Sequence, residues 1–199
     1  IMFNNCYTGK RVFVTGHTGF KGSWLVMWLI SLGARVGGYS LYIPSNPSLF
    51  KELDIDHQIK NYKGDVSDYN YLKQVIRDFK PDIIFHLAAQ PIVRKSYEDP
   101  GETFRTNLIG TINILDLIRD DSKISAGVFI TSDKCYENFE KYEGYREEDQ
   151  LGGKDPYSAS KACAEIAFSS YFRSYFNNKH SAKISVARAG NVIGGGDWA

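Results

Sequence analysis

Cysteine is scarce in this chain, and the residues of this type are far apart. The 199 residues include three cysteines, Cys6, Cys135 and Cys163, with no Cys-x-x-Cys pair among them. This spacing argues against a disulfide framework and against a structural zinc site, so no metal is expected. A reducing compartment fits the composition best, and we expect a cytoplasmic protein whose length suffices for a sizeable core.

Long apolar runs are also missing. The longest extends over residues 24–30, far short of the roughly 20 residues that a membrane helix needs. Residues 1–10 lack the apolar centre of a signal peptide. Neither sign of charge predominates, because 24 basic and 23 acidic side chains give a formal net charge of +1. We therefore expect neither a membrane nor a nucleic acid as partner.

Short β-type runs alternate with longer helical patterns along the chain. Strands are predicted over 11–15, 34–40, 59–64, 82–89, 126–131 and 183–189, and helices over 23–32, 69–79, 101–119 and 158–176. The stretch 41–57, with its two prolines, is predicted to be mostly loop with one short helix. Strands that alternate with crossover helices favour an α/β fold, a doubly wound parallel sheet of the Rossmann type.

No repeat, linker or low-complexity segment divides the sequence. We therefore expect residues 1–199 to form one dinucleotide-binding Rossmann domain. The last six residues, GGGDWA, are loop-type sequence rather than the end of an element. We expect the chain to be truncated there, before a further domain.

Three glycines separate the first predicted strand from the first helix. Gly16, Gly19 and Gly22 stand in GHTGFKG, with Thr18 and Phe20 between them. Glycine permits a tight turn and lets the backbone approach a pyrophosphate, and the helix behind it offers free N–H groups. A glycine triplet alone is often just a turn, but its place between strand and helix indicates a dinucleotide site.

Two further positions concern the identity of the dinucleotide. Ser40 ends the second strand, where an acidic residue would bind the ribose of NAD, and no arginine follows to accept a 2′-phosphate. The residues themselves therefore leave NAD and NADP open. Asp65 and Val66 follow the third strand, and Asp65 could equally be a turn or helix-cap residue.

A Tyr-x-x-x-Lys pair begins the last predicted helix. Tyr157 and Lys161 project from one face of it, and the lysine charge would lower the pKa of the phenol from about 10. Such pairs also occur on many surface helices. Here the pair follows the strand predicted over 126–131, with Ser132 directly after it, on the carboxyl edge where doubly wound sheets bind ligands. The three residues predict removal of a hydroxyl proton coupled to hydride transfer, with Ser132 holding the reacting oxygen.

Asp133 and Lys134 follow Ser132 directly. A reductase or epimerase needs only hydride transfer and one base, whereas a dehydratase must also remove a carbon-bound proton and expel water. Those steps require a further acid and base. Lys134 could be that base if burial or the charge of Lys161 lowered its pKa. Alternatively, Lys134 only anchors a phosphate or pairs with Asp133.

Five segments together carry a family resemblance. GHTGFKGSWL, HLAAQP, TSDKCYEN, DPYSASK and ARAGNVIGGGDWA resemble the extended short-chain dehydrogenase/reductase superfamily, and within it the CDP-glucose 4,6-dehydratases. The resemblance runs from about Lys10 to the last residue. It implies NAD as cofactor, the nucleotide sugar CDP-glucose as substrate, and a smaller C-terminal substrate domain that is largely absent here. A role in making deoxysugars for surface polysaccharide, such as lipopolysaccharide, is implied in the same way.

The resemblance also implies roles for individual residues. Asp133 would protonate the leaving hydroxyl, and Ser-Asp-Lys replaces the Thr-Asp-Glu that many sugar-nucleotide 4,6-dehydratases carry. Arg188 and Asn191 would meet the substrate. The residues expected to contact the cofactor are Asp65 and Val66 at the adenine, and Leu87, Ala88 and Ala89 along its length, although the last three are also ordinary buried-strand residues.

The two long helices, 101–119 and 158–176, resemble a pair that forms a four-helix interface between two subunits. A homodimer is therefore expected, although both helices could instead only pack against the sheet. Two other functions stay open. One is a nucleotide-sugar 4-epimerase, against which Asp133 and Lys134 argue, and the other is a non-catalytic dinucleotide sensor, against which the intact Ser132, Tyr157 and Lys161 argue.

Overall fold

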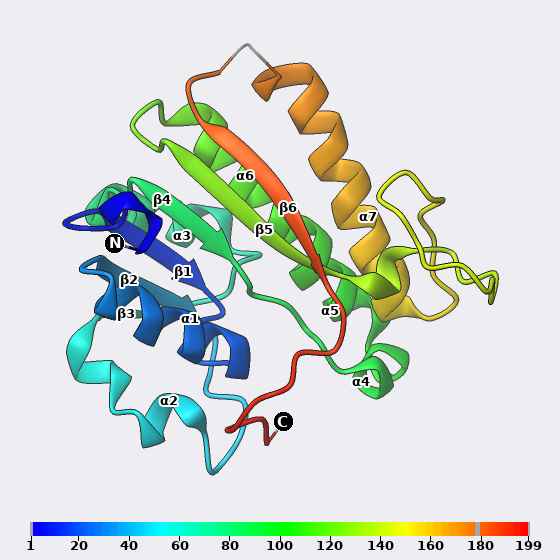
Figure 1. The fold of residues 1–199 in the computed structure, drawn as a ribbon, viewed down its shortest axis with the longest axis horizontal. Helices are drawn as coiled ribbons and strands as arrows, with labels where there is room; N and C mark the ends of the chain where they lie inside the picture. Colours follow the sequence, from blue (N-terminus) through cyan, green and yellow to red (C-terminus); the bar gives the residue numbers. More distant parts are fainter. Residues whose placement is uncertain (1, 178–179, 199) are drawn as a thin grey trace.

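A six-stranded parallel sheet forms the centre of the computed structural model, which describes residues 2–177 and 180–198 (Figure 1). Its strands are β1 (Arg11–Thr15), β2 (Arg35–Ser40), β3 (Lys60–Lys63), β4 (Ile83–His86), β5 (Ala126–Ser132) and β6 (Lys183–Ala189). They lie in the order β3-β2-β1-β4-β5-β6, and every neighbouring pair is parallel. The order reverses between β1 and β4, so the predicted doubly wound Rossmann fold is confirmed.

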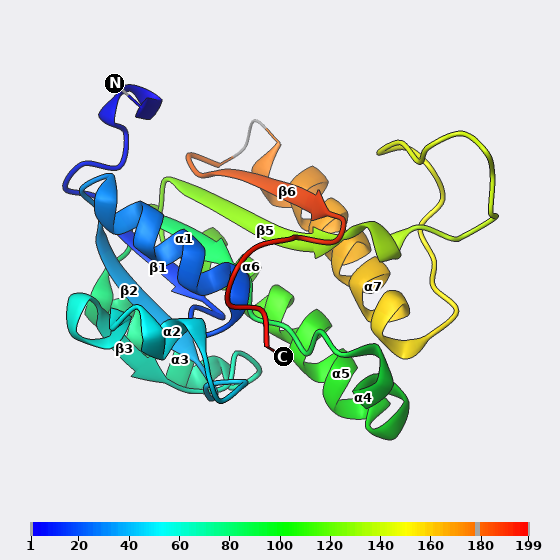
Figure 2. The ribbon, with the colours of Figure 1, turned by 60° about the horizontal axis from the view of Figure 1, so that its bottom comes forward.

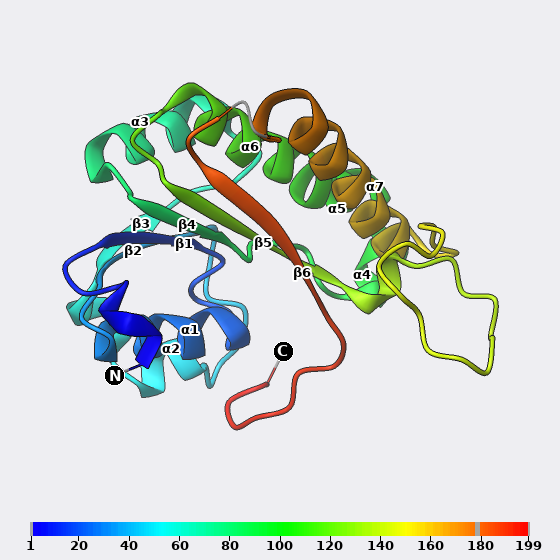
Figure 3. The ribbon, with the colours of Figure 1, turned by 45° about the horizontal axis from the view of Figure 1, so that its top comes forward.

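Helices cover the two faces of the sheet unequally (Figure 3). On one face α1 (Phe20–Ser31) and α2 (Leu49–Glu52) lie over the β1–β3 half, while α3 (Tyr69–Phe79), α6 (Gly110–Asp120) and α7 (Pro156–Tyr171) cover the other face across its width. Within the described residues, no helix covers β5 and β6 on the α1 side. The segment after β6 instead runs back past the carboxyl ends of the strands toward α1 (Figure 2), where Trp24 Nε1 donates to the Gly195 carbonyl at 3.0 Å.

Short helical segments complete the structure. They are η1 (Met2–Asn5), η2 (Ile55–Gln58), α4 (Val93–Glu98), α5 (Pro100–Phe104), the π-helical turn η3 (Arg105–Ile109), η4 (Asp133–Cys135) and a second π-helical turn, η5 (Phe172–Phe176). No helix among the described residues is long and apolar enough to cross a membrane.

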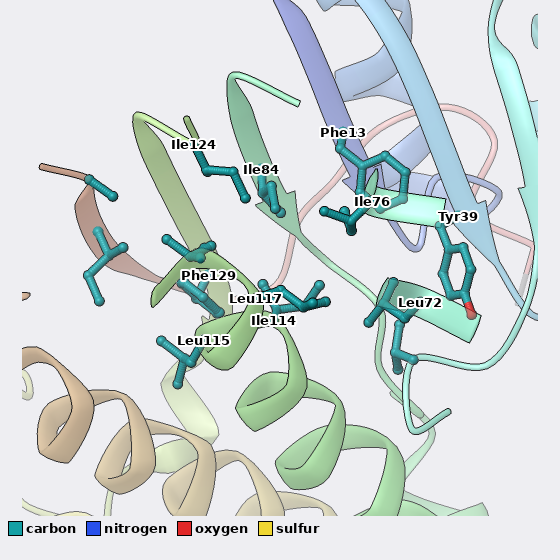
Figure 4. Close-up of a cluster of buried hydrophobic side chains, with 14 of the residues drawn as sticks. Phe13, Tyr39, Leu72, Ile76, Ile84, Ile114, Leu115, Leu117, Ile124 and Phe129 are labelled. Carbon is teal, nitrogen blue, oxygen red and sulfur yellow. The ribbon is translucent and has the colours of Figure 1, made fainter. Parts of the chain in front are cut away.

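Alternation along β1 divides its side chains between two hydrophobic cores. Val12 and Val14 point toward α1 and pack with Val26, whereas Phe13 points to the opposite face. The larger core lies between the sheet and helices α3 and α6, and Figure 4 shows Phe13 with Leu72, Ile76, Ile84, Ile114 and Phe129 among its members. All of β1 except its first residue is buried, which explains why the strand reads as a continuous apolar run.

Several predicted elements are found at the predicted residues. The strands over 11–15 and 183–189 and the helix over 69–79 match the structure at both ends. The Asp68 carboxylate accepts a hydrogen bond of 3.1 Å from the Tyr71 N–H and so caps this helix. The chain turns sharply after α1 at Gly33, which has a φ of 80°.

Other predicted boundaries are wrong. The helix predicted from residue 23 begins at Phe20, because the glycine turn itself supplies the first helical turn and Ser23 N–H already bonds to the Gly19 carbonyl. The strand predicted over 82–89 ends at His86, because the N–H groups of Leu87 and Ala88 turn to the Thr15 hydroxyl. Helix α4 was not predicted at all.

The two long predicted helices are also altered in detail. The first begins at Pro100 and is continuous through α5, η3 and α6, with a π-helical turn in its middle. The second begins at Pro156, earlier than predicted, and its last five residues form η5. The stretch 41–57 holds α2 and the start of η2 rather than one short helix.

Candidate active site

A groove of about 510 Å³ lies at the carboxyl ends of the strands, where the strand order reverses. Its volume is that of a typical small-molecule site. Sixteen of the predicted site residues line it: Gly16, Thr18, Gly19, Phe20, Gly22, Ser40, Asp65, Val66, Leu87, Ala88, Ala89, Ser132, Lys134, Tyr157, Lys161 and Asn191. The turn after β1, the start of α7 and the segment after β6, far apart in sequence, thus meet at one place.

The glycine turn brings backbone close to backbone on one wall of the groove. A Cβ on Gly16, whose φ is 74°, would lie 2.7 Å from the Ala88 nitrogen, and a Cβ on Gly22 would overlap the Gly16 carbonyl oxygen. A Cβ on Gly19 would meet only the Gly16 oxygen, at 3.4 Å, so this glycine borders open space. The N-terminus of α1 therefore faces the groove without an intervening side chain, an arrangement that suits a pyrophosphate.

A buried hydrogen-bond network fixes the end of β4, which lies against the glycine turn. The Thr15 hydroxyl donates to His86 Nδ1 at 2.8 Å and accepts the N–H groups of Leu87 and Ala88, both at 3.2 Å. His86 Nε2 then donates to the Thr111 hydroxyl at 3.2 Å. Burial lowers the pKa of His86 to about 3, so the ring is neutral and can accept from Thr15. This network was not predicted from the sequence, although a histidine at the end of an apolar strand is a signal that a partner exists.

The side chain of Ser40 is hydrogen-bonded to His17 of the glycine turn. Its hydroxyl donates to His17 Nδ1 at 2.9 Å, and His17 Nε2 donates to Asn61 Oδ1 at 2.9 Å. Burial lowers the pKa of His17 to about 4, against the opposing effect of its hydrogen bonds. The end of β2 thus carries a neutral hydrogen-bonded pair where an acidic residue would bind a ribose, and it does not itself choose between NAD and NADP.

The start of α7 positions the tyrosine and the lysine. The Asp155 carboxylate accepts from the Ser158 N–H at 2.9 Å, which caps the helix and places Tyr157 in its first turn. Burial raises the pKa of Tyr157, while the hydrogen bond with the Ser132 hydroxyl lowers it. Burial, together with the charge of Lys21, lowers the pKa of Lys161 to about 8.

These pKa shifts modify the sequence-based expectation. Burial has the largest effect on Tyr157, and its direction is opposite to the lowering expected from Lys161. The observed lowering influence comes instead from Ser132, which lies at the end of β5. The structure therefore brings Ser132, Tyr157 and Lys161 together on one groove.

Lys134 lines the groove beside Ser132, whereas Asp133, the predicted acid, is not among the lining residues. The Ser132 hydroxyl donates to Asp133 Oδ1 at 3.0 Å and accepts from the Lys134 N–H at 3.2 Å. Lys134 Nζ lies 3.9 Å from Asp133 Oδ1, and both side chains are about half exposed, so this ion pair is weak. The loose pairing predicted as an alternative for Lys134 is present, and Lys134 still lines the groove.

Arg188 does not reach the groove, in contrast to the role predicted for it. Its guanidinium donates to both carboxylate oxygens of Glu165, at 3.0 and 3.1 Å, and to the Tyr136 hydroxyl at 2.8 Å. These bonds direct it into the space between α7 and β6. Asn191, the other residue predicted to meet the substrate, is exposed and lines the groove.

Several groove residues were not predicted, among them Lys21, Tyr42, Gln90, Thr106 and Asp197. Lys21 is the most informative of them, because burial lowers its pKa while Asp197 opposes that effect. Its signal in the sequence was a cation inside the glycine turn, in the first turn of a helix that faces the groove. Among the described residues, no group of three or more His, Cys, Asp and Glu side chains is placed to hold a metal ion.

The family model for GDP-mannose 4,6 dehydratase matches residues 13–186. The chain belongs to this family. It is 52% identical over 199 residues to the CDP-glucose 4,6-dehydratase of Salmonella typhimurium. The matched region covers 98% of this chain and 55% of that protein. The predicted resemblance is thereby confirmed. A dTDP-glucose 4,6-dehydratase of Xanthomonas campestris is 28% identical over 171 residues, covering 81% of this chain and 49% of that protein.

Solved structures share the fold. A dTDP-glucose 4,6-dehydratase from Streptomyces venezuelae with NAD bound superposes with a TM-score of 0.77 at 26% identity, over 89% of this chain and 55% of that chain. The chain spans about half the length of the curated relatives that it matches.

Proposed function

We propose that this chain is the cofactor-binding and catalytic unit of a CDP-glucose 4,6-dehydratase. The reaction would convert CDP-glucose to CDP-4-keto-6-deoxyglucose and water. The observation that carries the proposal is the placement of Lys134 and Ser132 on the groove that also holds Tyr157 and Lys161. Asp133 lies next to them and accepts a hydrogen bond from the Ser132 hydroxyl. The 52% identity to the Salmonella enzyme of that name supports the choice of nucleotide sugar.

NAD is the cofactor that we propose for the groove. The open space at Gly19 and the N-terminus of α1 suit its pyrophosphate, Asp65 and Val66 would contact the adenine, and Leu87 to Ala89 would lie along it. When bound, its nicotinamide would accept a hydride from C4 of the sugar and return it to C6.

The residues of this chain would move the protons. Tyr157 would take the proton from the 4-hydroxyl while Ser132 holds that oxygen, which leaves a ketone at C4. A ketone makes the neighbouring C5–H acidic, and Lys134 would remove that proton and give a proton back to C5 when the hydride returns to C6. Asp133 would donate a proton to the departing 6-hydroxyl, which leaves as water. Asn191 would contact the substrate, whereas Arg188 is already bonded to Glu165.

Product analysis tests this proposal. Full-length protein incubated with CDP-glucose and NAD is expected to form a 4-keto sugar nucleotide lighter by one water, with no net accumulation of NADH. A 4-epimerase would instead return an isomer of unchanged mass with inverted C4. Unchanged substrate in the presence of bound NAD would favour a non-catalytic sensor, and either result would overturn the dehydratase proposal.

The base role of Lys134 has its own test. Solvent deuterium should enter C5 during turnover of the unmodified chain and should enter much more slowly in Lys134→Ala. Lys154→Ala, a change of an exposed lysine in the loop before α7, is the matched control. Undiminished incorporation in Lys134→Ala would remove Lys134 from this role.

We also propose that the protein is a cytoplasmic homodimer that supplies deoxysugars for lipopolysaccharide. Helices α6 and α7 lie side by side on one face of the sheet (Figure 1), and Ile109, Ile166 and Phe172 on these helices and their π-helical turns remain 37–56% exposed. All three cysteines are free, as expected for a reducing compartment. Sedimentation should show a dimer for the unmodified chain and a monomer for Ile166→Glu. Ile193→Glu, which changes an exposed residue in the segment after β6, is the control and should remain a dimer.

A further inference from the structure

Glu165 is a buried acid that the proposed reaction does not use. It lies on α7, one turn beyond Lys161, and its side chain is 5% exposed. Its carboxylate accepts a short hydrogen bond from the Thr131 hydroxyl on β5 and two from the Arg188 guanidinium on β6. Glu165 therefore joins α7 to the two strands at the edge of the sheet.

Arg188 extends this connection to the segment after β5. Besides Glu165, its guanidinium donates to the Tyr136 hydroxyl at 2.8 Å and to the Glu147 carbonyl at 3.1 Å. It also lies 4.8 Å from the centre of the Tyr136 ring, which stacks on Tyr145. Arg188 thus uses the planar, forked geometry that distinguishes arginine from lysine.

The contact of Glu165 with Thr131 and that of Arg188 with Tyr136 lie on either side of the proposed catalytic segment 132–134. Thr131 immediately precedes Ser132, and Tyr136 follows Lys134 with one residue between them. Both flanking residues are therefore held by the same ion pair, while Tyr157 and Lys161 belong to the helix that carries Glu165. The pair connects the strand-end half of the site to the helical half.

A purely stabilising role explains this arrangement poorly. The cost of removing two charges from water offsets much of the attraction in a buried ion pair, so such pairs are a weak source of stability. They do fix geometry, because both partners must keep their alignment to remain satisfied. Here that geometry sets where Ser132 to Lys134 lie relative to α7.

We propose that Glu165 and Arg188 are positioning residues that hold Ser132, Asp133 and Lys134 in register with Tyr157 and Lys161. The inference rests on the proposed function for its kinetic consequence, but its structural consequence is independent of the substrate. Neither residue lines the groove. Disturbing the pair should therefore lower kcat while leaving NAD affinity and KM for CDP-glucose nearly unchanged.

Three variants of the full chain disturb the contacts of the Glu165–Arg188 pair to different extents. Glu165→Gln keeps the side-chain shape but removes the charge, Arg188→Lys keeps the charge but not the fork, and Tyr136→Phe removes only one acceptor. The first two should lower kcat by roughly 10- to 100-fold, because small displacements of catalytic groups have effects of this size. Tyr136→Phe should have a smaller effect of the same sign.

The matched control is Arg119→Lys on α6. Arg119 forms ion pairs with Asp116 at 2.7 Å and Asp120 at 2.9 Å, outside the groove. This variant should retain the kcat of the unmodified chain. Circular dichroism and thermal melting identify any variant that is unfolded at the assay temperature, and the milder Tyr136→Phe then carries the comparison.

Amide hydrogen exchange supplies a readout without substrate. Exchange across residues 132–137 should accelerate in Arg188→Lys and Glu165→Gln but not in Arg119→Lys. Unchanged kcat in both variants, in a chain that forms the 4-keto sugar, would overturn the positioning role. If the unmodified chain forms no 4-keto sugar, the proposed function fails, and unchanged exchange across 132–137 would overturn the positioning role separately.

Discussion

The two halves of the sheet hold their functional groups by different means. In the β1–β3 half, the glycine turn works by the absence of side chains, since a Cβ on Gly16 or Gly22 would collide with neighbouring backbone. In the β4–β6 half, buried polar side chains hold the strand ends: His86 between Thr15 and Thr111, and Glu165 with its partners on two strands.

The difference indicates how each half should fail. In the β1–β3 half, which carries the proposed cofactor site, the glycine turn has no space for a further side-chain atom. Substitutions that add atoms there should therefore impair folding and cofactor binding. The half that carries the proposed chemistry depends on paired polar groups, so it should be sensitive to the loss of a partner. Binding and catalysis should therefore be separable by mutation.

The largest effect is expected from Tyr157→Phe. Removing the hydroxyl that takes the substrate proton should lower kcat by about 10³-fold, within the range found for general acid–base catalysis. NAD affinity should stay close to that of the unmodified chain, because the glycine turn is intact. Steady-state kinetics and NAD titration measure both quantities, with Tyr97→Phe, a 65% exposed residue on α4, as control. A loss of binding equal to the loss of kcat would contradict the separation.

The converse variant is Gly22→Ala in the cofactor half. Alanine gains about 1 kcal/mol over glycine in a helix, but its Cβ would overlap the Gly16 carbonyl oxygen, which is backbone and cannot move alone. We expect a net loss of about 1–3 kcal/mol of unfolding free energy, together with weakened NAD binding. Chemical denaturation measures the unfolding free energy, and NAD titration measures the binding.

Gly144→Ala is the control, because no atom lies within 4 Å of a Cβ built there. It should leave both quantities unchanged. Equal stability of Gly22→Ala and Gly144→Ala would show that the turn tolerates added atoms after all.

The buried His86 predicts a pH-dependent stability. Its folded pKa of about 3 lies below the ordinary value of 6.5, so between these values the unfolded chain binds a proton that the folded chain does not. Its contribution is therefore present above pH 6.5 and is lost as the pH falls toward 3, by up to about 1.4 kcal/mol per pH unit. Between pH 4 and 6, the unfolding free energy measured by chemical denaturation should rise less steeply with pH in His86→Gln than in the unmodified chain. The control is His57→Gln, which changes a side chain that is 81% exposed in its contact with Asp54 and should keep the pH dependence of the unmodified chain. An unchanged pH dependence in His86→Gln would contradict the pKa given for His86.

The smallest expected effect concerns Lys21. Its charge helps to lower the pKa of Lys161 to about 8, so Lys21→Met should raise that pKa. If turnover needs Lys161 protonated, the alkaline limb of the kcat–pH profile should move to higher pH. Lys63→Met, which changes an exposed lysine at the end of β3, should not move it. A shift to lower pH in Lys21→Met would contradict the proposed coupling.

The sequence predicts what depends on local pattern. The sheet, the glycine turn and the Tyr157–Lys161 pair follow from motifs within a few residues of one another. The groove residues Asp65, Val66, Leu87 to Ala89 and Asn191 were instead predicted from the family resemblance. The polar networks do not, because their partners are distant in sequence: Thr15 and His86 are 71 residues apart, and Thr131 and Glu165 are 34 apart. Arg188 illustrates the limit, since its residue type suits a phosphate and only the packing of α7 against β6 directs it to Glu165.

Transfer of an isotope label tests the dehydratase proposal most directly. Full-length protein should be given CDP-glucose carrying deuterium at C4, with NAD, and the product examined by nuclear magnetic resonance. Because the hydride removed from C4 would be returned to C6, the account predicts a 4-keto-6-deoxy product with the deuterium at C6. Deuterium retained at C4 of an inverted sugar would contradict it and identify an epimerase instead.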